Sequence, residues 1–264
     1  MRKLGPVALI FHAVFVVFIL APLVMVMAVS FTDKGYLSLP TDGLSLRWFY
    51  AILDNPAFID AFWMSTWLGL VAATLAVVLA VPAALAIARH KFPGRDVIAA
   101  FLLSPLMIPH LVLGVAFLQF YSSIGLGGSF AGLAAAHIIL ITPYALRLAL
   151  ASATGLSVDA EHAALTLGAN KFIVFRKITL PLILPGVAGG WMLSFITSFD
   201  ELTMSIFVAS PSTTTLPVRM YHHITQTIDP LIASVSTVLI VMTVVLMLIL
   251  DWFYGLDKVF IGKG

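Results

Sequence analysis

The chain has 264 residues, of which 61% are hydrophobic and only 10% are charged, whereas a soluble domain is about a quarter charged. A soluble globule of this size could not bury so much apolar surface, so the composition predicts a membrane protein. The long uncharged runs described below predict that it is an all-α membrane protein. The net charge of +2 comes from scattered cations and gives no indication of nucleic-acid binding. No cysteine is present, which excludes a disulfide framework and a thiolate metal site.

The chain opens with Arg2 and Lys3, and a stretch without formal charge then extends from Leu4 to Thr32. A cleavable signal peptide begins in the same way, but its apolar region is usually only about 7–15 residues long. We therefore expect a retained membrane span over residues 6–31.

Five further spans follow. A helix that crosses the bilayer needs about 20 mostly apolar residues. Residues 97–146 contain no Asp, Glu, Lys or Arg and are too long for one such helix, and the stretch 122–132, rich in Gly and Ser, divides them. The sequence predicts a single transmembrane domain, residues 1–264, whose N-terminal span precedes a five-span core within 61–254. The core spans are 61–88, two within 97–146, 178–199 and 230–250.

The cations indicate the orientation of the six spans. If both termini are cytoplasmic, every lysine and arginine lies inside except Lys34, Arg47 and Arg219, as the positive-inside rule requires. We therefore expect a multi-pass protein of the inner or plasma membrane, in contact with lipid. The polar segment between the fourth and fifth spans then lies in the cytoplasm.

This polar segment has the pattern of two short helices. Ser157 can cap the first helix, and Asp159 and Glu161 suit the positive end of its dipole. Gly168 is typical of the position just after a helix, and Asn170 can cap the second. A narrow apolar stripe recurs at helical spacing, formed by Ala160, Ala163, Ala164 and Leu167.

Physical chemistry alone leaves two interpretations of the stripe open. A helix that rests on lipid headgroups prefers large apolar residues on its buried face. A stripe made mostly of alanine suits close packing against another protein.

The same segment resembles the cytoplasmic EAA motif of permease subunits in ABC importers. That pattern is Glu-Ala-Ala, three residues, Gly, nine residues, Ile, any residue, Leu-Pro. The matching positions here are Ala163, Ala164, Gly168, Ile178, Leu180 and Pro181. The chain departs from the pattern at its first position, where His162 replaces the usual Glu and Glu161 lies one residue earlier.

The resemblance implies a type I ABC importer permease fold with six transmembrane helices, in which residues 158–169 form a coupling helix docked on a separate ATPase. It also implies three kinds of partner: a second, homologous permease subunit, two ATP-binding cassette subunits and an extracytoplasmic solute-binding protein. The chain has no Gly-x-x-x-x-Gly-Lys-Ser/Thr loop, so we expect no cofactor in it and ATP and Mg in the ATPase. The residues expected at the ATPase contact are Glu161, His162, Ala163, Ala164, Gly168 and Ala169.

Ionisable residues within or beside a span are candidates for a solute pathway. Asp200 and Glu201 follow the fifth predicted span, and two carboxylates facing a pore attract a cationic solute. The segment 194–221 resembles the matching region of polyamine-type permeases, where an acidic pair precedes Thr-Thr-Thr-Leu-Pro-Val. Alternatively, both acids simply reach the outside water at the helix end.

Two further residues are candidates for the pathway. His110 lies in the third predicted span where polyamine-type relatives commonly carry an acid, so a zwitterionic or anionic solute and a hydrogen-bonded core histidine both stay open. Trp48, before the second span, is either a solute contact or an interfacial anchor. His222 and His223 are adjacent, but no further His or Cys cluster surrounds them, so no metal site is predicted.

The sequence therefore predicts a non-enzymatic permease subunit that imports a small organic solute of the polyamine type, and the acidic pair favours a cation. A self-sufficient secondary carrier or channel is the alternative from another class, but carriers often contain inverted repeats with broken helices, and no such repeat is visible. A membrane-embedded enzyme lacks support, because no His-Glu-x-x-His motif or nucleophile–base pair is present.

Overall fold

The computed structural model describes residues 5–254, which form helices and loops without a strand. Five of the described helices are long and apolar enough to cross a membrane, and one bent helix pair is a sixth candidate. The prediction of an all-α membrane protein is therefore confirmed. The chain divides into two compact units, one made of residues 1–59 with 220–264 and the other of residues 60–219.

The first unit contains the two ends of the chain. Its helices are α1 (Pro6–Val29), α2 (Arg47–Leu53) and α12 (Leu231–Tyr254), and α12 packs against both others. The Ser234 hydroxyl, buried in α12, donates a hydrogen bond of 3.2 Å to the carbonyl of Ser30, just after α1. This bond joins residues 204 positions apart in sequence.

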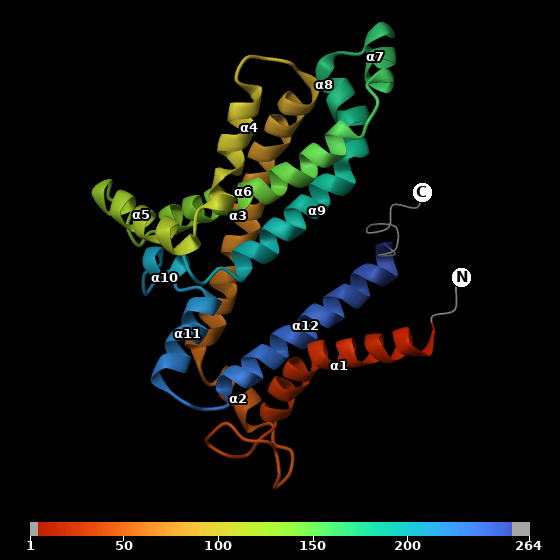
Figure 1. Cartoon of the computed structure of the whole chain (residues 1–264). Helices are drawn as coiled ribbons and strands as arrows, with labels where there is room; N and C mark the ends of the chain where they lie inside the picture. The colour runs from red at the N-terminus through yellow and green to blue at the C-terminus, as the bar shows by residue number, and fades with distance from the viewer. Residues whose placement is uncertain (1–4, 255–264) are drawn as a thin grey trace. The chain divides into compact units, whose positions relative to one another are not determined.

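The second unit contains the predicted core spans (Figure 1). Helices α3 and α11 each extend across the boundary with the first unit. The elements are α3 (Pro56–Arg89), α4 (Arg95–Leu103), η1 (Ser104–Met107), α5 (His110–Ser123), α6 (Phe130–Thr154), α7 (Asp159–Thr166), α8 (Lys171–Val174), η2 (Phe175–Thr179), α9 (Leu180–Phe199), α10 (Ser205–Val208) and α11 (Leu216–Gln226).

Helices α6 and α9 lie side by side along their length (Figure 1). Gly186 and Gly190, one turn apart on α9, face α6 so closely that a Cβ on Gly186 would lie 2.7 Å from the carbonyl oxygen of Leu148. A Cβ on Gly190 would lie 3.2 Å from the Cα of Ala145. This small-xxx-small spacing lets membrane helices approach backbone to backbone. The buried residues around the crossing are also mostly small: Ala80, Ala84, Ala145, Ala149 and Ala153.

The third predicted span differs from a single straight helix. Helices α4 and α5 meet at an angle of 101° across the break at Ile108 and Pro109. Proline has no N–H to continue a helix and pushes the preceding residue towards an extended conformation, and Ile108 has ψ 127°. The Gly- and Ser-rich division predicted further on is confirmed, because α5 ends at Ser123 and α6 begins at Phe130.

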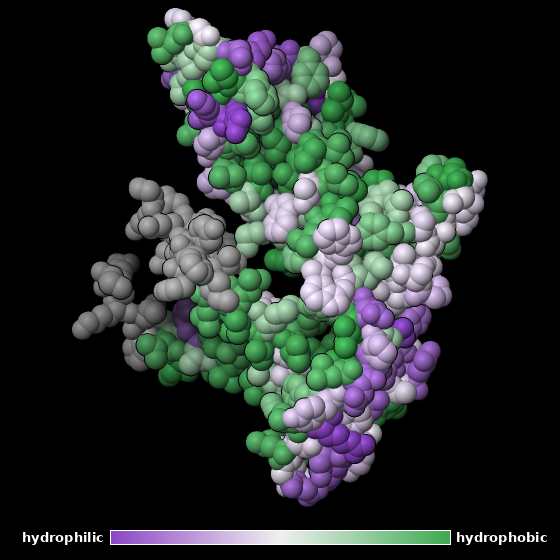
Figure 2. All heavy atoms as spheres, turned by 180° about the vertical axis from the view of Figure 1, so that it is seen from behind, coloured by the Kyte–Doolittle hydropathy of each residue, from purple (hydrophilic) through white to green (hydrophobic). Residues whose placement is uncertain are grey.

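Hydrophobic residues cover the long helices, and hydrophilic residues gather at the end of the second unit that carries α7 (Figure 2). Exposed apolar side chains on α9 include Leu182, Leu184 and Ile196. Such a surface is suited to lipid or to other membrane helices rather than to water.

Candidate functional site

The polar segment folds as the two short helices that the sequence predicts, although α7 is shorter than the predicted helix over 158–169. Gly168 has φ +87°, a left-handed conformation that favours glycine. Its N–H donates to the carbonyl of Leu165, and the N–H of Ala169 donates to that of Ala164, both at 3.0 Å. This pair of bonds is a Schellman motif, so the predicted role of Gly168 in ending the helix is confirmed.

The caps at the other helix ends are only partly as predicted. Asn170 caps α8, since its side-chain oxygen accepts the Ile173 N–H at 2.8 Å. Ser157 is one residue too early to be the N-cap of α7, a position that Val158 occupies. Its hydroxyl instead donates to the Asp159 carboxylate at 2.6 Å and accepts the Asp159 N–H at 3.1 Å.

Helix α7 has no fully buried residue. Ala160, His162 and Ala163 are exposed, and Ala164 and Ala169 are half-buried. Leu167, at the turn after the helix, is 88% exposed. Helix α7 and the turn after it therefore present small side chains outwards together with two leucines, Leu165 and Leu167, which are 42% and 88% exposed.

Glu161 points inwards, unlike its neighbour His162. One carboxylate oxygen, Oε1, accepts hydrogen bonds from Arg89 Nη2 and Thr179 Oγ1, both at 3.0 Å. The Arg89 guanidinium also donates to the Leu156 carbonyl at 3.2 Å. The Arg89 and Glu161 side chains are only 14% and 18% exposed, so this is a largely desolvated ion pair. Glu161 was among the residues predicted from the sequence for the ATPase contact, whereas its two partners within the chain were not predicted.

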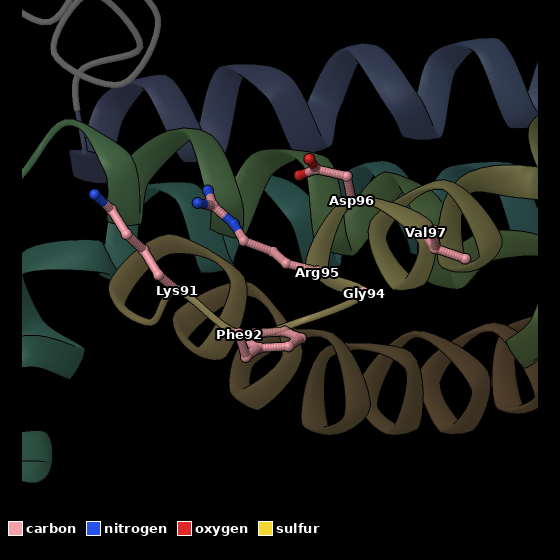
Figure 3. A pocket seen from close by; sticks show the side chains of 6 residues that line it. All are labelled: Lys91, Phe92, Gly94, Arg95, Asp96 and Val97. Carbon is pink, nitrogen blue, oxygen red and sulfur yellow. The ribbon is translucent and has the colours of Figure 1, made fainter.

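The loop between α3 and α4 is basic and lies directly after Arg89. It encloses a shallow cavity of about 300 Å³ lined by Lys91, Phe92, Gly94, Arg95, Asp96 and Val97. The side chains of Lys91, in the loop, and Arg95, at the start of α4, extend in the same direction (Figure 3). The predicted orientation places these cations at the cytoplasmic surface.

The structure brings His110 and Glu201 together. His110, the first residue of α5, places its Nδ1 2.8 Å from Glu201 Oε2. Glu201 Oε1 accepts the backbone N–H of Met204 at 2.7 Å, and the Glu201 side chain is only 5% exposed. Asp200 is the exposed C-cap residue of α9. The two neighbouring acids therefore differ, since Glu201 is bonded and buried while Asp200 faces outwards.

A second buried histidine holds the same segment. His137 on α6 is fully buried, with Nδ1 2.8 Å from the Ser198 hydroxyl and Nε2 3.0 Å from the Ser205 hydroxyl. Its two contacts therefore connect the end of α9 and the start of α10 to α6. This geometry is that of a polar contact between packed helices.

The other candidate residues lie in the first unit. Trp48 is 9% exposed, donates its indole N–H to the Lys34 carbonyl at 3.1 Å, and lies under the Arg47 guanidinium. These contacts stabilise its own loop. His223 Nε2 lies 3.0 Å from Asp229 Oδ1. No group of three or more metal-binding side chains occurs among the described residues.

The fold is that of a type I ABC importer permease. It is shared by a chain of a bacterial ABC transporter involved in the import of the acidic polysaccharide alginate, with a TM-score of 0.71 over 94% of this chain and 95% of that chain, at 15% identity. Residues 76–256 match the family described as binding-protein-dependent transport system inner membrane component, and the chain belongs to this family.

Two relatives from Escherichia coli (strain K12) match most of the chain. The spermidine/putrescine transport system permease protein PotC is 28% identical over 227 residues, which cover 86% of each protein. The putrescine transport system permease protein PotI is 30% identical over 230 residues, which cover 84% of this chain and 82% of PotI. The chain is thus a transport subunit in the inner membrane, and ATP hydrolysis takes place in a separate subunit of the importer.

Proposed function

We propose that this permease imports a polyamine-type organic amine. The proposal of this solute class rests on the relatives PotC and PotI, whose names specify spermidine or putrescine transport. The proposed assembly contains a second, homologous permease subunit, two ATP-binding cassette subunits and an extracytoplasmic solute-binding protein. Both termini and α7 lie in the cytoplasm, and the ATPase subunits alone bind ATP and Mg.

The exposed surface of α7 supports its role as the coupling helix. Ala160 and Ala163 are exposed and small, and the two exposed leucines, Leu165 and Leu167, are only two positions apart, so they do not share a helix face. A helix lying on lipid would present several large apolar side chains on one face. Small side chains instead allow the backbone of α7 to approach another protein closely, which suits insertion in an ATPase cleft.

The docking of α7 is tested by co-purification of the cognate ATPase with the permease. We expect Ala163→Glu to lose the ATPase, because it adds bulk and charge, and Ala163→Ser to retain it. Gly168→Val should also lose the ATPase, because a branched residue is strained at φ +87°, whereas Gly168→Asn tolerates that conformation. Normal ATPase binding and hydrolysis in both damaging variants would rule out docking through α7.

The charges around His110 support a cationic solute. Asp200 and Glu201 each bring a carboxylate, and His110 is the basic group that contacts Glu201. With both carboxylates ionised, this cluster has a net negative charge whether His110 is neutral or protonated. A negative cluster beside a solute path attracts an ammonium group and repels an anion.

The solute class is tested by uptake of radiolabelled putrescine into proteoliposomes that contain the complete importer. Asp200→Asn removes a charge but keeps size and hydrogen bonding, and should lower uptake about tenfold, which corresponds to about 1.4 kcal/mol. Asp200→Glu should retain more activity. Asp96→Asn, which neutralises an exposed acid at the α7 end, is the matched control and should transport normally.

A second candidate solute class is favoured by His110 alone. If the solute is zwitterionic or anionic, His110→Ala is the damaging change and Asp200→Asn is harmless or beneficial. Full putrescine uptake by both Asp200→Asn and Glu201→Gln would discard the role of the acidic pair.

A further inference from the structure

Four segments of the second unit converge on the Arg89–Glu161 ion pair. Arg89 is the last residue of α3, Leu156 lies in the loop between α6 and α7, Glu161 is on α7, and Thr179 ends η2 directly before α9. All the connecting hydrogen bonds are 3.0–3.2 Å long. Glu161, Arg89 and Thr179 are here called the α7 joint.

The joint replaces the apolar packing that α7 lacks. A helix of 8 residues is marginal by itself, and α7 buries no side chain fully. Charge-assisted hydrogen bonds in a largely desolvated site are stronger than ordinary ones. The connection of α7 to the membrane spans therefore depends on Glu161 more than on the alanine stripe.

Thr179 connects the joint to an irregular part of the fifth span. Residues 175–179 form a π-helix, in which the backbone departs from regular α-helical bonding, and Thr179 is its last residue. Single-turn π-helices inside α-helices occur frequently at functional sites. A displacement of α7 would therefore reach α9 through Thr179 and α3 through Arg89.

We propose that the α7 joint transmits the movement of the docked ATPase to α3 and α9, so that these three side chains position the spans without contacting solute or nucleotide. Glu161 turns its carboxylate towards its own chain, whereas His162 faces outwards. The inference rests on the proposed docking of α7. It predicts that breaking the joint separates ATP hydrolysis from transport while the ATPase stays bound.

The test uses the reconstituted importer and measures three quantities: ATPase co-purified, ATP hydrolysed and putrescine imported per ATP. Arg89→Gln, Glu161→Gln and Thr179→Val should bind the ATPase normally but import about tenfold less putrescine per ATP, as expected for one lost charge-assisted contact. Thr179→Ser keeps the hydroxyl and should restore the wild-type ratio. Arg95→Gln is the matched control, because it removes a nearby cation that forms no ion pair with the described residues.

Two results would overturn the proposed role of the α7 joint. One is a wild-type import ratio in both Glu161→Gln and Thr179→Val. The other is a loss of uptake that is matched by loss of assembled complex, since a purely structural contact lowers the amount of importer and not its ratio. Failure of the proposed function would give a different result, because the wild-type permease itself would then bind no ATPase or import no putrescine.

Discussion

At the scale of single residues, the buried histidine His137 is a polar contact in an apolar core. Both ring nitrogens lie within hydrogen-bonding distance of serine hydroxyls on other segments, at 2.8 and 3.0 Å. A neutral imidazole has one donor and one acceptor, and a hydroxyl can serve as either, so all three groups can be satisfied together. This contact connects α6 to the segment that contains Asp200 and Glu201.

We predict that His137→Leu destabilises the permease by about 1–3 kcal/mol, because it leaves Ser198 and Ser205 without their partner. Thermal unfolding in detergent, followed by tryptophan fluorescence, measures the loss. His222→Leu, at an exposed position, is the control and should unfold like the wild type. Identical unfolding of the two variants would mean that the His137 bonds contribute nothing to stability.

Residue types and motif spacing were sufficient to predict several local features. Gly168 and Asn170 have the conformations expected from their chemistry, because a C-terminal glycine and an N-cap amide act within one helical turn. The partners of Glu161 and Glu201 were not predictable. Arg89 is 72 positions from Glu161, and His110 is 91 positions from Glu201, so only the tertiary fold determines these pairs.

At the scale of secondary structure elements, the close contact between α6 and α9 depends on two glycines. The pattern Gly186-x-x-x-Gly190 was present in the sequence and is a recognised signal for close helix packing in membranes. No helix contact was predicted from it. Gly189, between them, faces more open space, since its nearest neighbour would lie 3.8 Å from an added Cβ.

These three glycines give a matched series. Gly186→Ala should destabilise the protein by about 1–3 kcal/mol, because its Cβ would overlap Ser152 and the backbone of Leu148. Gly190→Ala should cost less, since its contacts are longer. Gly189→Ala should be neutral or stabilising by up to about 1 kcal/mol, because alanine is the better helix former. Thermal unfolding of the three variants gives the order, and equal effects would contradict close packing at Gly186.

The lengths of the helices could be predicted from their apolar runs, but the direction of the bend at Pro109 could not be predicted without the tertiary structure. Proline predicts an interruption without specifying the direction of the next helix. That direction depends on packing, because Gly114 on α5 lies against Met204, directly before α10. A Cβ added to Gly114 would lie only 3.1 Å from the Cα of Met204. This contact joins residues that are distant in sequence.

At the scale of the whole molecule, the proposed topology places the two ends of α6 on opposite sides of the membrane. Its 25 residues extend about 37 Å at 1.5 Å per residue, which exceeds a hydrocarbon core of about 30 Å. Ile124, the C-cap residue of α5, and Leu167, the C-cap residue of α7, lie on either side of α6 in the sequence, and both are exposed.

We therefore predict that cysteines introduced singly at Ile124 and Leu167 react with a membrane-impermeant maleimide from opposite sides, Leu167 from the cytoplasm. The natural chain contains no cysteine, so each variant reports one position. Labelling in intact cells and in inverted vesicles distinguishes the sides. Reaction of both positions from the same side would exclude the topology.

The break between α4 and α5 has a consequence for hydration. Where a helix stops inside a bilayer, carbonyl groups lose their intrahelical donors, and hydrocarbon supplies none in exchange. Non-helical backbone at that depth persists only where protein encloses it or water reaches it. Met107, next to the break, is 86% exposed in the single chain. If the bend lies within the membrane, we expect either a partner helix or a column of water to reach it there, beside the His110–Glu201 pair.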